Sequence, residues 1–308
     1  MERILVTGAT GFIGSHLVKK LVQQGISVYV IVRDRRKAEE CLAEVLQKIV
    51  IYQREGSVYS LADFLQTEKI EGVIHLATHY ITENSADDIE ELIESNILFG
   101  TQILEAMKLA GVKKFINAGS SWQHYNHDTY NPVNLYAATK QAFEDLLHYY
   151  TQAEEIRAIT LEIYDTYGAE DHRNKIINRW KRNIVEREVI SLSLGEQKLD
   201  YILIEDVLEA ILQAIKIVDD VFDKEKVYEK KYAVCSGHFY TLKEIAEIFE
   251  QVYHTKLQIA WGTLPYRKRE VFEPYSGTEI LPGWEAKYSL KEGLQYMYQK
   301  EQRKKGED

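Results

Sequence analysis

The sequence predicts an α/β fold in which a doubly wound parallel sheet is joined to a smaller C-terminal α/β substrate lobe. Residues 4–7 form a short apolar run with β-branched members, which is typical of a buried strand. Glycines follow at positions 8, 11 and 14, and apolar residues at helical spacing begin after them. Strand-like and helix-like segments then alternate over the first half of the chain, as right-handed crossovers between parallel strands require.

The other elements of this sheet follow in order along the chain. Strands are expected at 28–32, 48–52, 73–77 and 114–118. Helices are expected at 37–46, at about 60–68, from an acidic start at 85 to about 110, and from 134 to about 150. A helix from 205 and a strand at 232–235 should return to the sheet. The predicted domains are therefore 1–167 plus 205–236, and 168–204 plus 237–298, with a frayed charged tail at 299–308.

Composition excludes several classes of protein. With 45% hydrophobic and 28% charged residues among 308, the chain is expected to be globular with a large core. Its net charge of −10 argues against nucleic acid as a main partner. Cys41 and Cys235 lie far apart and form no redox or metal motif, which favours a reduced, cytoplasmic protein. We expect no signal peptide, because the first strand follows Met1 directly, and no membrane partner, because no apolar run could cross a bilayer.

The glycine loop predicts a dinucleotide-binding site. Gly8 would form the tight turn, Gly11 would let the backbone approach a pyrophosphate, and Gly14 would let the helix pack on the strand. The helix N-terminus would then hold the phosphates through its free N–H groups. The spacing is G-x-x-G-x-x-G, and the alternative is a glycine-rich turn that binds nothing. The residues expected to contact the cofactor here are Gly8, Thr10, Gly11, Phe12, Ile13 and Gly14.

The end of the second strand favours NADP(H) over NAD. In this fold an acidic residue there binds the ribose hydroxyls of NAD, whereas an arginine suits the 2′-phosphate of NADP. Val32 stands at the position expected for the acid, and Arg33 follows it. A guanidinium can bind a phosphate through two parallel hydrogen bonds, so Arg33 and Arg36 are assigned to this site. Solvated surface charges are the alternative, and Asp34 complicates the count.

A serine, a tyrosine and a lysine form a candidate catalytic group. Tyr136 and Lys140 are four residues apart on an expected helix and share a face, and Ser120 ends a neighbouring strand. A nearby ammonium lowers the pKa of a phenol from about 10 toward the range useful for proton donation. A serine hydroxyl can hold the substrate oxygen as charge develops on it. A Tyr-x-x-x-Lys pair alone arises by chance among 21 tyrosines, but its order after the glycine loop and Ser120 predicts a carbonyl-reducing site.

Motifs along nearly the whole chain resemble one known family. They are Thr7–Gly14, His75-Leu76-Ala77, Asn96…Gly100-Thr101, Ser120, Tyr136…Lys140, Tyr167-Gly168, Asp200-Tyr201-Ile202 and Gly283-Trp284. In this order they resemble the extended short-chain dehydrogenase/reductases, which include sugar-nucleotide epimerases, dehydratases and reductases. The resemblance implies a Rossmann sheet, catalytic roles for Ser120, Tyr136 and Lys140, and cofactor contacts from Leu76, Ala77, Tyr136 and Lys140. It also implies a homodimer built on the helices that start near residues 96 and 136.

Departures from the family pattern narrow the expected reaction. Dehydratases carry an acidic pair after the catalytic serine or threonine, where this chain has Ser121 and Trp122. Epimerases that retain NAD usually carry the acidic residue that is missing after the second strand. The short span from Ser120 to Tyr136 most resembles the CDP-abequose/paratose synthase branch, which reduces nucleotide-linked 4-keto-6-deoxyhexoses with NADPH. A sugar-nucleotide 4-epimerase and a non-catalytic NADP(H)-sensing regulator stay open as alternatives.

The resemblance assigns a few further contacts. Ser57 stands where many relatives have an aspartate that contacts adenine. Ser121 and Trp122 are expected against the nucleotide-sugar substrate, with core packing the alternative for Trp122. Lys175 and Arg267 are expected near its diphosphate, with surface ion pairs the alternative. No metal site is expected, because the histidines at 124 and 127 have no third ligand in view.

Overall fold

The large sheet is parallel throughout. The computed structural model describes residues 1–54, 56–225 and 228–307, and within them seven strands pair in the order β11-β6-β5-β4-β1-β2-β3. The strands are β1 (Arg3–Thr7), β2 (Ser27–Val32), β3 (Ile49–Gln53), β4 (Gly72–His75), β5 (Lys114–Ser120), β6 (Arg157–Ile163) and β11 (Glu229–Val234). The strand order reverses between β1 and β4, which is where the ligand crevice opens in a doubly wound sheet. The predicted fold class is confirmed.

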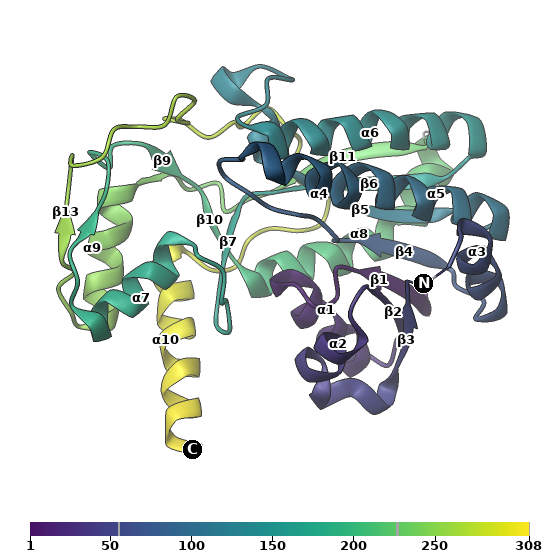
Figure 1. Ribbon diagram of the computed structural model, residues 1–308, viewed down its shortest axis with the longest axis horizontal. Coiled ribbons are helices and arrows are strands. Elements are labelled where there is room, and N and C mark those ends of the chain that lie inside the picture. The colour runs from purple at the N-terminus through teal and green to yellow at the C-terminus, as the bar shows by residue number, and fades with distance from the viewer. Residues whose placement is uncertain (55, 226–227, 308) are drawn as a thin grey trace.

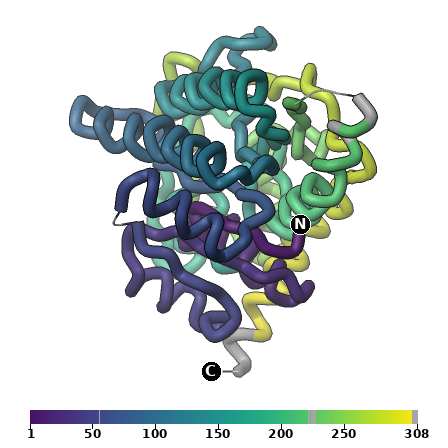
Figure 2. The backbone as a smooth tube through the Cα atoms, turned by 90° about the vertical axis from the view of Figure 1, so that its right-hand side faces the viewer, coloured from purple at the N-terminus to yellow at the C-terminus, as the bar shows by residue number. Residues whose placement is uncertain are grey.

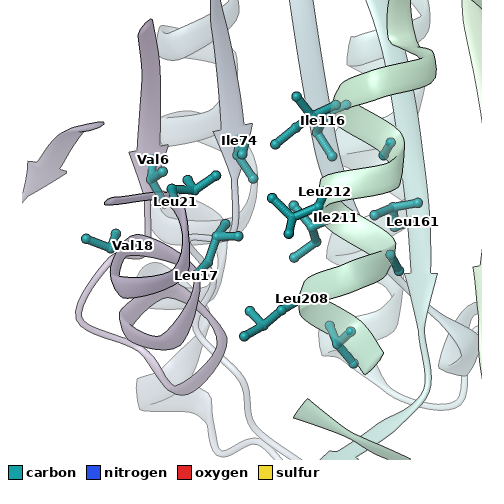
Figure 3. Close-up of a cluster of buried hydrophobic side chains, with 14 of the residues drawn as sticks. Val6, Leu17, Val18, Leu21, Ile74, Ile116, Leu161, Leu208, Ile211 and Leu212 are labelled. Atoms are coloured by element: carbon teal, nitrogen blue, oxygen red, sulfur yellow. The ribbon is translucent and has the colours of Figure 1, made fainter. Parts of the chain in front are cut away.

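Helices cover both faces of this sheet (Figure 1). One face carries α1 (Phe12–Gln23), α2 (Arg35–Cys41) and α8 (Ile204–Glu225), and the other carries α3 (Val58–Thr67), α5 (Phe99–Ala110) and α6 (Leu135–Glu154). Figure 3 shows leucines and isoleucines of α1 and α8 meeting over β1, β4, β5 and β6. On β2, Val28 and Val30 belong to this cluster while Tyr29 and Ile31 belong to the opposite one. Apolar residues on both sides of the strand are what burial between two helical layers requires.

The helix expected from 85 to 110 has a change of geometry in its middle. A 3₁₀ turn (Ala86–Asp88) leads into α4 (Ile89–Ile93), and a π-helical turn (Glu94–Leu98) joins α4 to α5. Within the π turn the buried Asn96 accepts hydrogen bonds from the Thr78 hydroxyl at 3.0 Å and the His79 N–H at 2.7 Å. Its amide donates to the Thr139 hydroxyl at 2.9 Å. The π turn therefore joins the loop after β4 to α6, which is typical of such turns near functional sites.

Short strands and three helices form the smaller lobe at the left of Figure 1. β7 (Asp165–Tyr167) pairs with β10 (Tyr201–Leu203), β8 (Ile190–Ser191) with β13 (Ile259–Ala260), and β9 (Lys198–Leu199) with β12 (Tyr240–Thr241). The helices are α7 (Ile176–Glu186), α9 (Leu242–Tyr253) and α10 (Leu290–Glu307). Trp180 and Phe249 lie in its separate core.

Two segments differ from the expected elements. The segment expected as one helix at 37–46 divides into α2 and a 3₁₀ helix (Ala43–Lys48). α10 continues through most of the segment expected as a frayed tail, and its Glu301 pairs with Lys181 of α7 at 2.9 Å. This ion pair joins the last turns of the chain to the smaller lobe, while residue 308 lies outside the described part. Within the described residues, no helix is both long and apolar enough to span a bilayer.

Candidate active site

The glycine loop lies at one end of a cavity of about 400 Å³ at the carboxyl edge of the sheet. Gly8 has φ +67°, and a Cβ added there would lie 2.6 Å from the backbone of Leu76 and Ala77. A Cβ added to Gly14 would collide with the carbonyl oxygen of Gly8. The loop can therefore approach β4 and start α1 only if these positions are glycine. Thr10, Gly11, Phe12 and Ile13 line the cavity beside the helix N-terminus, where N–H groups can receive an anion.

Thr7 connects the glycine loop to the segment after β4. Its buried hydroxyl oxygen accepts from the N–H of Leu76 at 3.2 Å and of Ala77 at 3.1 Å, and both of those residues line the cavity. The same hydroxyl lies 2.9 Å from Nδ1 of His75. Burial lowers the pKa of His75 to about 3, with Lys140 adding to the effect, so this ring is neutral at ordinary pH. His75 accordingly has a structural position beneath the cavity floor.

Three cations line the cavity next to the end of β2. They are Arg33, Lys37 and Arg54. The Arg33 guanidinium is 66% exposed and lies 3.5 Å from the carboxylate of Glu91. Arg54 lies over the ring of Phe99, with 4.5 Å between its Cζ and the ring centroid. Two of these cations, Lys37 and Arg54, were absent from the predicted site.

Residues adjacent to this cluster have other contacts. The Asp34 carboxylate caps α2 by accepting from the Lys37 N–H at 3.1 Å, so it belongs to the helix end. Arg36 is almost fully exposed and pairs with Glu40 one turn along α2, outside the cavity lining. Ser57 caps α3 and borders a smaller neighbouring pocket that shares Arg54 with the main cavity.

The predicted Ser120, Tyr136 and Lys140 all line the same cavity. Ser120 ends β5, and its hydroxyl oxygen accepts from the Trp122 N–H at 3.3 Å. Asn134 caps α6 through the Ala137 N–H, which places Tyr136 and Lys140 on one buried face within the first two turns of the helix. The Lys140 ammonium donates to the Ala118 carbonyl of β5 at 2.7 Å. Strand end and helix start thus bring the three side chains together.

Burial controls the ionisation of this group. It raises the pKa of Tyr136 to about 12, and the nearby Tyr80 adds to the rise. Lys175 and hydrogen bonds with Thr78 and Ser120 act in the opposite direction. Burial also lowers the pKa of Lys140 to about 8. The phenol of the free protein is therefore protonated at neutral pH and able to donate.

An aromatic and cationic wall faces Tyr136 across the cavity. The Tyr80 ring meets the Tyr136 ring edge-on at 5.0 Å and the Trp122 ring at 5.9 Å between centroids. The Lys175 ammonium pairs with the Asp165 carboxylate at 2.9 Å and lies 4.5 Å from the Tyr80 centroid. Ser121, Trp122 and Lys175, which the sequence assigns to substrate, all line the cavity.

The sequence pattern did not show which of two arginines, Arg173 or Arg267, lies in the cavity. Arg267 is exposed, lies outside the cavity lining, and its backbone N–H donates to the Glu270 carboxylate. Arg173 lines the cavity, with its guanidinium 4.4 Å from the Phe12 centroid and two hydrogen bonds to the Asp171 carboxylate. A cation close after the β7 strand was the signal available for Arg173. Among the described residues, no three histidine, cysteine, aspartate or glutamate side chains form a metal-binding group.

The sheet order, the glycine loop and the Ser–Tyr–Lys group in one cavity define a short-chain dehydrogenase/reductase fold. The sequence profile of the NAD dependent epimerase/dehydratase family matches residues 4–228. The chain belongs to this family, as its motifs indicate.

Relatives and solved structures match over most of the chain. It is 28% identical to a CDP-abequose synthase of Salmonella muenchen over 299 residues, which cover 96% of this chain and 97% of that protein. A CDP-abequose synthase of Yersinia pseudotuberculosis is 32% identical over 273 residues, covering 88% and 91%. MoeE5 in complex with UDP-glucuronic acid and NAD has a TM-score of 0.81 at 24% identity, covering 98% and 99%. UDP-glucuronic acid 4-epimerase from Bacillus cereus has a TM-score of 0.83 at 22% identity, with 98% and 99% covered. At these identities the two structures establish likeness of fold.

Proposed function

We propose that this protein uses NADPH to reduce the C4 keto group of a nucleoside-diphosphate 4-keto-6-deoxysugar. The observation that carries the proposal is one continuous cavity with the cations Arg33, Lys37 and Arg54 at one end and Ser120, Tyr136 and Lys140 in its lining. The similarity to CDP-abequose synthases along most of the chain supports this reaction over other reactions of the family. The acidic pair of the dehydratases is absent from the position after Ser120 in the sequence.

The residues present fit a phosphorylated dinucleotide. The loop has no room for a side chain at Gly8 or Gly14 and leaves the start of α1 open to a pyrophosphate. Arg33 and Lys37 would contact a 2′-phosphate, and Val32 offers no carboxylate to ribose hydroxyls. When bound, reduced nicotinamide supplies the hydride for the carbonyl carbon.

The side chains of the cavity supply the proton and stabilise the developing charge. The Ser120 hydroxyl, whose oxygen accepts from the Trp122 N–H, lies within hydrogen-bond reach of Tyr136 and would turn its proton to the C4 oxygen of the substrate. Tyr136 transfers its phenolic proton to that oxygen as negative charge develops there. Lys140 and Lys175 line the cavity with Tyr136, and the charge of Lys175 opposes the effect of burial on the pKa of that phenol. Trp122 and Tyr80 line this end of the cavity beside Tyr136.

The direct test follows NADPH oxidation with CDP-, UDP- and dTDP-linked 4-keto-6-deoxysugars. We expect one of these substrates to be converted with one NADPH consumed per product, and NADH to be used less well. Tyr136→Phe should lower turnover by about 10²–10⁴-fold without loss of NADP⁺ binding. Tyr59→Phe, on the exposed side of α3 and outside the cavity, is the matched control and should keep full activity. Conversion without net NADPH consumption would instead identify a 4-epimerase, and unchanged turnover of Tyr136→Phe would exclude the assigned proton donor.

We also propose that two copies pair through α5 and α6, which lie side by side in Figure 2. Large apolar side chains are exposed along this part of the chain, including Ile93, Leu98, Leu109, Leu146 and Tyr149. Light scattering after gel filtration should give the mass of a dimer. A monomer mass at micromolar concentration would reject the pairing.

A further inference from the structure

The Lys175 ammonium already has partners within the protein, which is unusual for a lysine expected to bind a diphosphate. It is the residue before α7, its side chain is 19% exposed, and its ammonium donates to Asp165 at 2.9 Å and to the Tyr80 hydroxyl at 3.3 Å. Two of its three N–H donors are thus used within the cavity wall. The partner carboxylate also neutralises the charge that a diphosphate would need.

Tyr80 connects this ion pair to the proton donor. Its ring lies under the Lys175 ammonium at 4.5 Å and meets the Tyr136 ring edge-on at 5.0 Å. Trp122 completes the contact, with 5.9 Å to the Tyr80 ring and 5.9 Å to the Lys175 ammonium. A cation over an aromatic face is attracted by the ring, so Lys175 and Tyr80 hold each other in place. Removing the Lys175 ammonium would therefore change the position of the Tyr136 ring through one intervening side chain, Tyr80.

The pKa values of the two lysines near Tyr136 are shifted in opposite directions, although burial lowers both. Burial lowers the pKa of Lys140 to about 8. For Lys175, burial acts in the same direction, but the Asp165 carboxylate outweighs it and the pKa of Lys175 rises above its ordinary value. Lys175 therefore keeps its charge over the whole range in which Lys140 changes protonation in the free protein.

We propose that Lys175 is a positioning residue for Tyr136: the Asp165–Lys175 pair fixes Tyr80, and Tyr80 fixes the phenol that donates the proton. The substrate diphosphate is then bound by other groups of the cavity. The inference rests on the proposed function, because it takes Tyr136 as the proton donor.

A spectroscopic test needs no turnover. In protein labelled with [¹³Cζ]tyrosine, Tyr136→Phe and Tyr80→Phe assign the two resonances by their disappearance. Lys175→Met should shift the Tyr136 resonance. Lys181→Met should not, because Lys181 lies on the helix that Lys175 precedes and forms a similarly buried pair with Glu301, away from Tyr80. Tyr80→Phe removes only the hydroxyl that accepts from Lys175 and should move the Tyr136 resonance as well. An unchanged Tyr136 resonance in Lys175→Met overturns the proposal.

Kinetics and nucleotide binding separate positioning from diphosphate binding. Lys175→Met should lower kcat about tenfold, a fraction of the effect of losing general acid catalysis, with KM changed less than about twofold. Lys175→Arg should recover part of kcat, because it keeps the charge.

By calorimetry, the Kd of CDP, UDP and dTDP should change less than about twofold in Lys175→Met. A tenfold rise in KM or Kd with kcat unchanged overturns the proposal in favour of diphosphate binding. If the unmodified protein reduces none of the CDP-, UDP- and dTDP-linked 4-keto-6-deoxysugars with NADPH, the proposed function fails. The resonance and Kd measurements then decide the inference alone.

Discussion

Replacing Lys140 by methionine should make the protein more stable at neutral pH while it removes most of the activity. Lys140 is 4% exposed, and burial lowers its pKa from 10.5 to about 8. The folded state therefore holds a charge at neutral pH that would be more stable in water. Methionine has a similar length and carries no charge, so it relieves this cost while it deletes the ammonium near Tyr136.

The size of the gain follows from the pKa. The values 10.5 and about 8 differ by about 2.5 pH units. At roughly 1.4 kcal/mol per unit, the buried charge costs the fold about 3 kcal/mol below pH 8. The lost hydrogen bond from the charged ammonium to the Ala118 carbonyl offsets about 2 kcal/mol of this gain. Lys140→Met should therefore raise the free energy of unfolding by about 1 kcal/mol at pH 7.

Urea unfolding at several pH values tests both the gain and its cause. Because the folded pKa of Lys140 lies below the unfolded value, the unfolded chain binds more protons between about pH 8 and 10.5. The unmodified protein gains stability as the pH rises through that range, so the advantage of Lys140→Met should shrink from about pH 8 upward. Lys181→Met is the control for loss of a lysine side chain from an ion pair. The reasoning is refuted if Lys140→Met is less stable than the parent at pH 7 by a margin that stays constant to about pH 9.5.

Three further substitutions test other parts of the site. Thr7→Val leaves two backbone N–H groups after β4 without an acceptor and should cost about 2–3 kcal/mol in urea unfolding, whereas Thr151→Val, which loses a bond to a helix carbonyl, should cost less than about 1 kcal/mol. Equal costs would show that the N–H groups find other partners. Gly14→Ala puts a methyl group against the glycine loop. In a calorimetric titration it should raise the Kd of NADP⁺ at least tenfold, which corresponds to about 1.4 kcal/mol of binding free energy. Arg33→Ala should lower kcat/KM for NADPH about tenfold and leave that for NADH unchanged, and equal losses with both cofactors would argue against its role in selectivity.

The parts of the molecule that sequence predicted well are those that neighbouring residues decide. Gly8 and Gly14 are required by contacts within one strand–turn–helix unit, so their spacing is enough to place the loop. Ser120, Tyr136 and Lys140 reach the cavity because each stands at a defined end of a strand or helix. The carboxyl ends of parallel strands lie at the same edge of a sheet, so residues at these ends come together in one site even when they are far apart in the chain.

Residues of the same type on one short segment could not be told apart. Arg33 and Arg36 lie three positions apart, but Arg33 lies at the end of β2 and lines the cavity whereas Arg36 lies inside α2 and pairs with Glu40. The direction of each side chain depends on where the helix begins, which Asp34 decides by capping it. The same limit applies to Arg267, which chemistry favours for a diphosphate and the fold leaves exposed.

The wall around Tyr80 was beyond sequence reasoning because its members come from distant segments. Tyr80 follows β4, Trp122 follows β5, Asp165 begins β7 and Lys175 precedes α7. No local pattern unites these positions. In the sequence, Asp165 and Lys175 are visible only as separate charges. The pairing of the two explains how a carboxylate is tolerated in a cavity that we propose receives anions.

A second buried charge network supports Ser120 from behind. The Gln123 side chain accepts from the Ser120 N–H at 3.0 Å and donates to the Glu144 carboxylate at 3.1 Å. Glu144 shares Lys231 with Glu162 of β6, whose side chain is fully buried. Burial raises the pKa of Glu144, whereas hydrogen bonds and Lys231 outweigh burial and lower the pKa of Glu162. Apolar side chains could fill this space at lower cost, but they could not accept from or donate to a polar loop. The network therefore gives the end of β5 a defined position, which the proposed reaction needs because it depends on one hydroxyl beside one phenol.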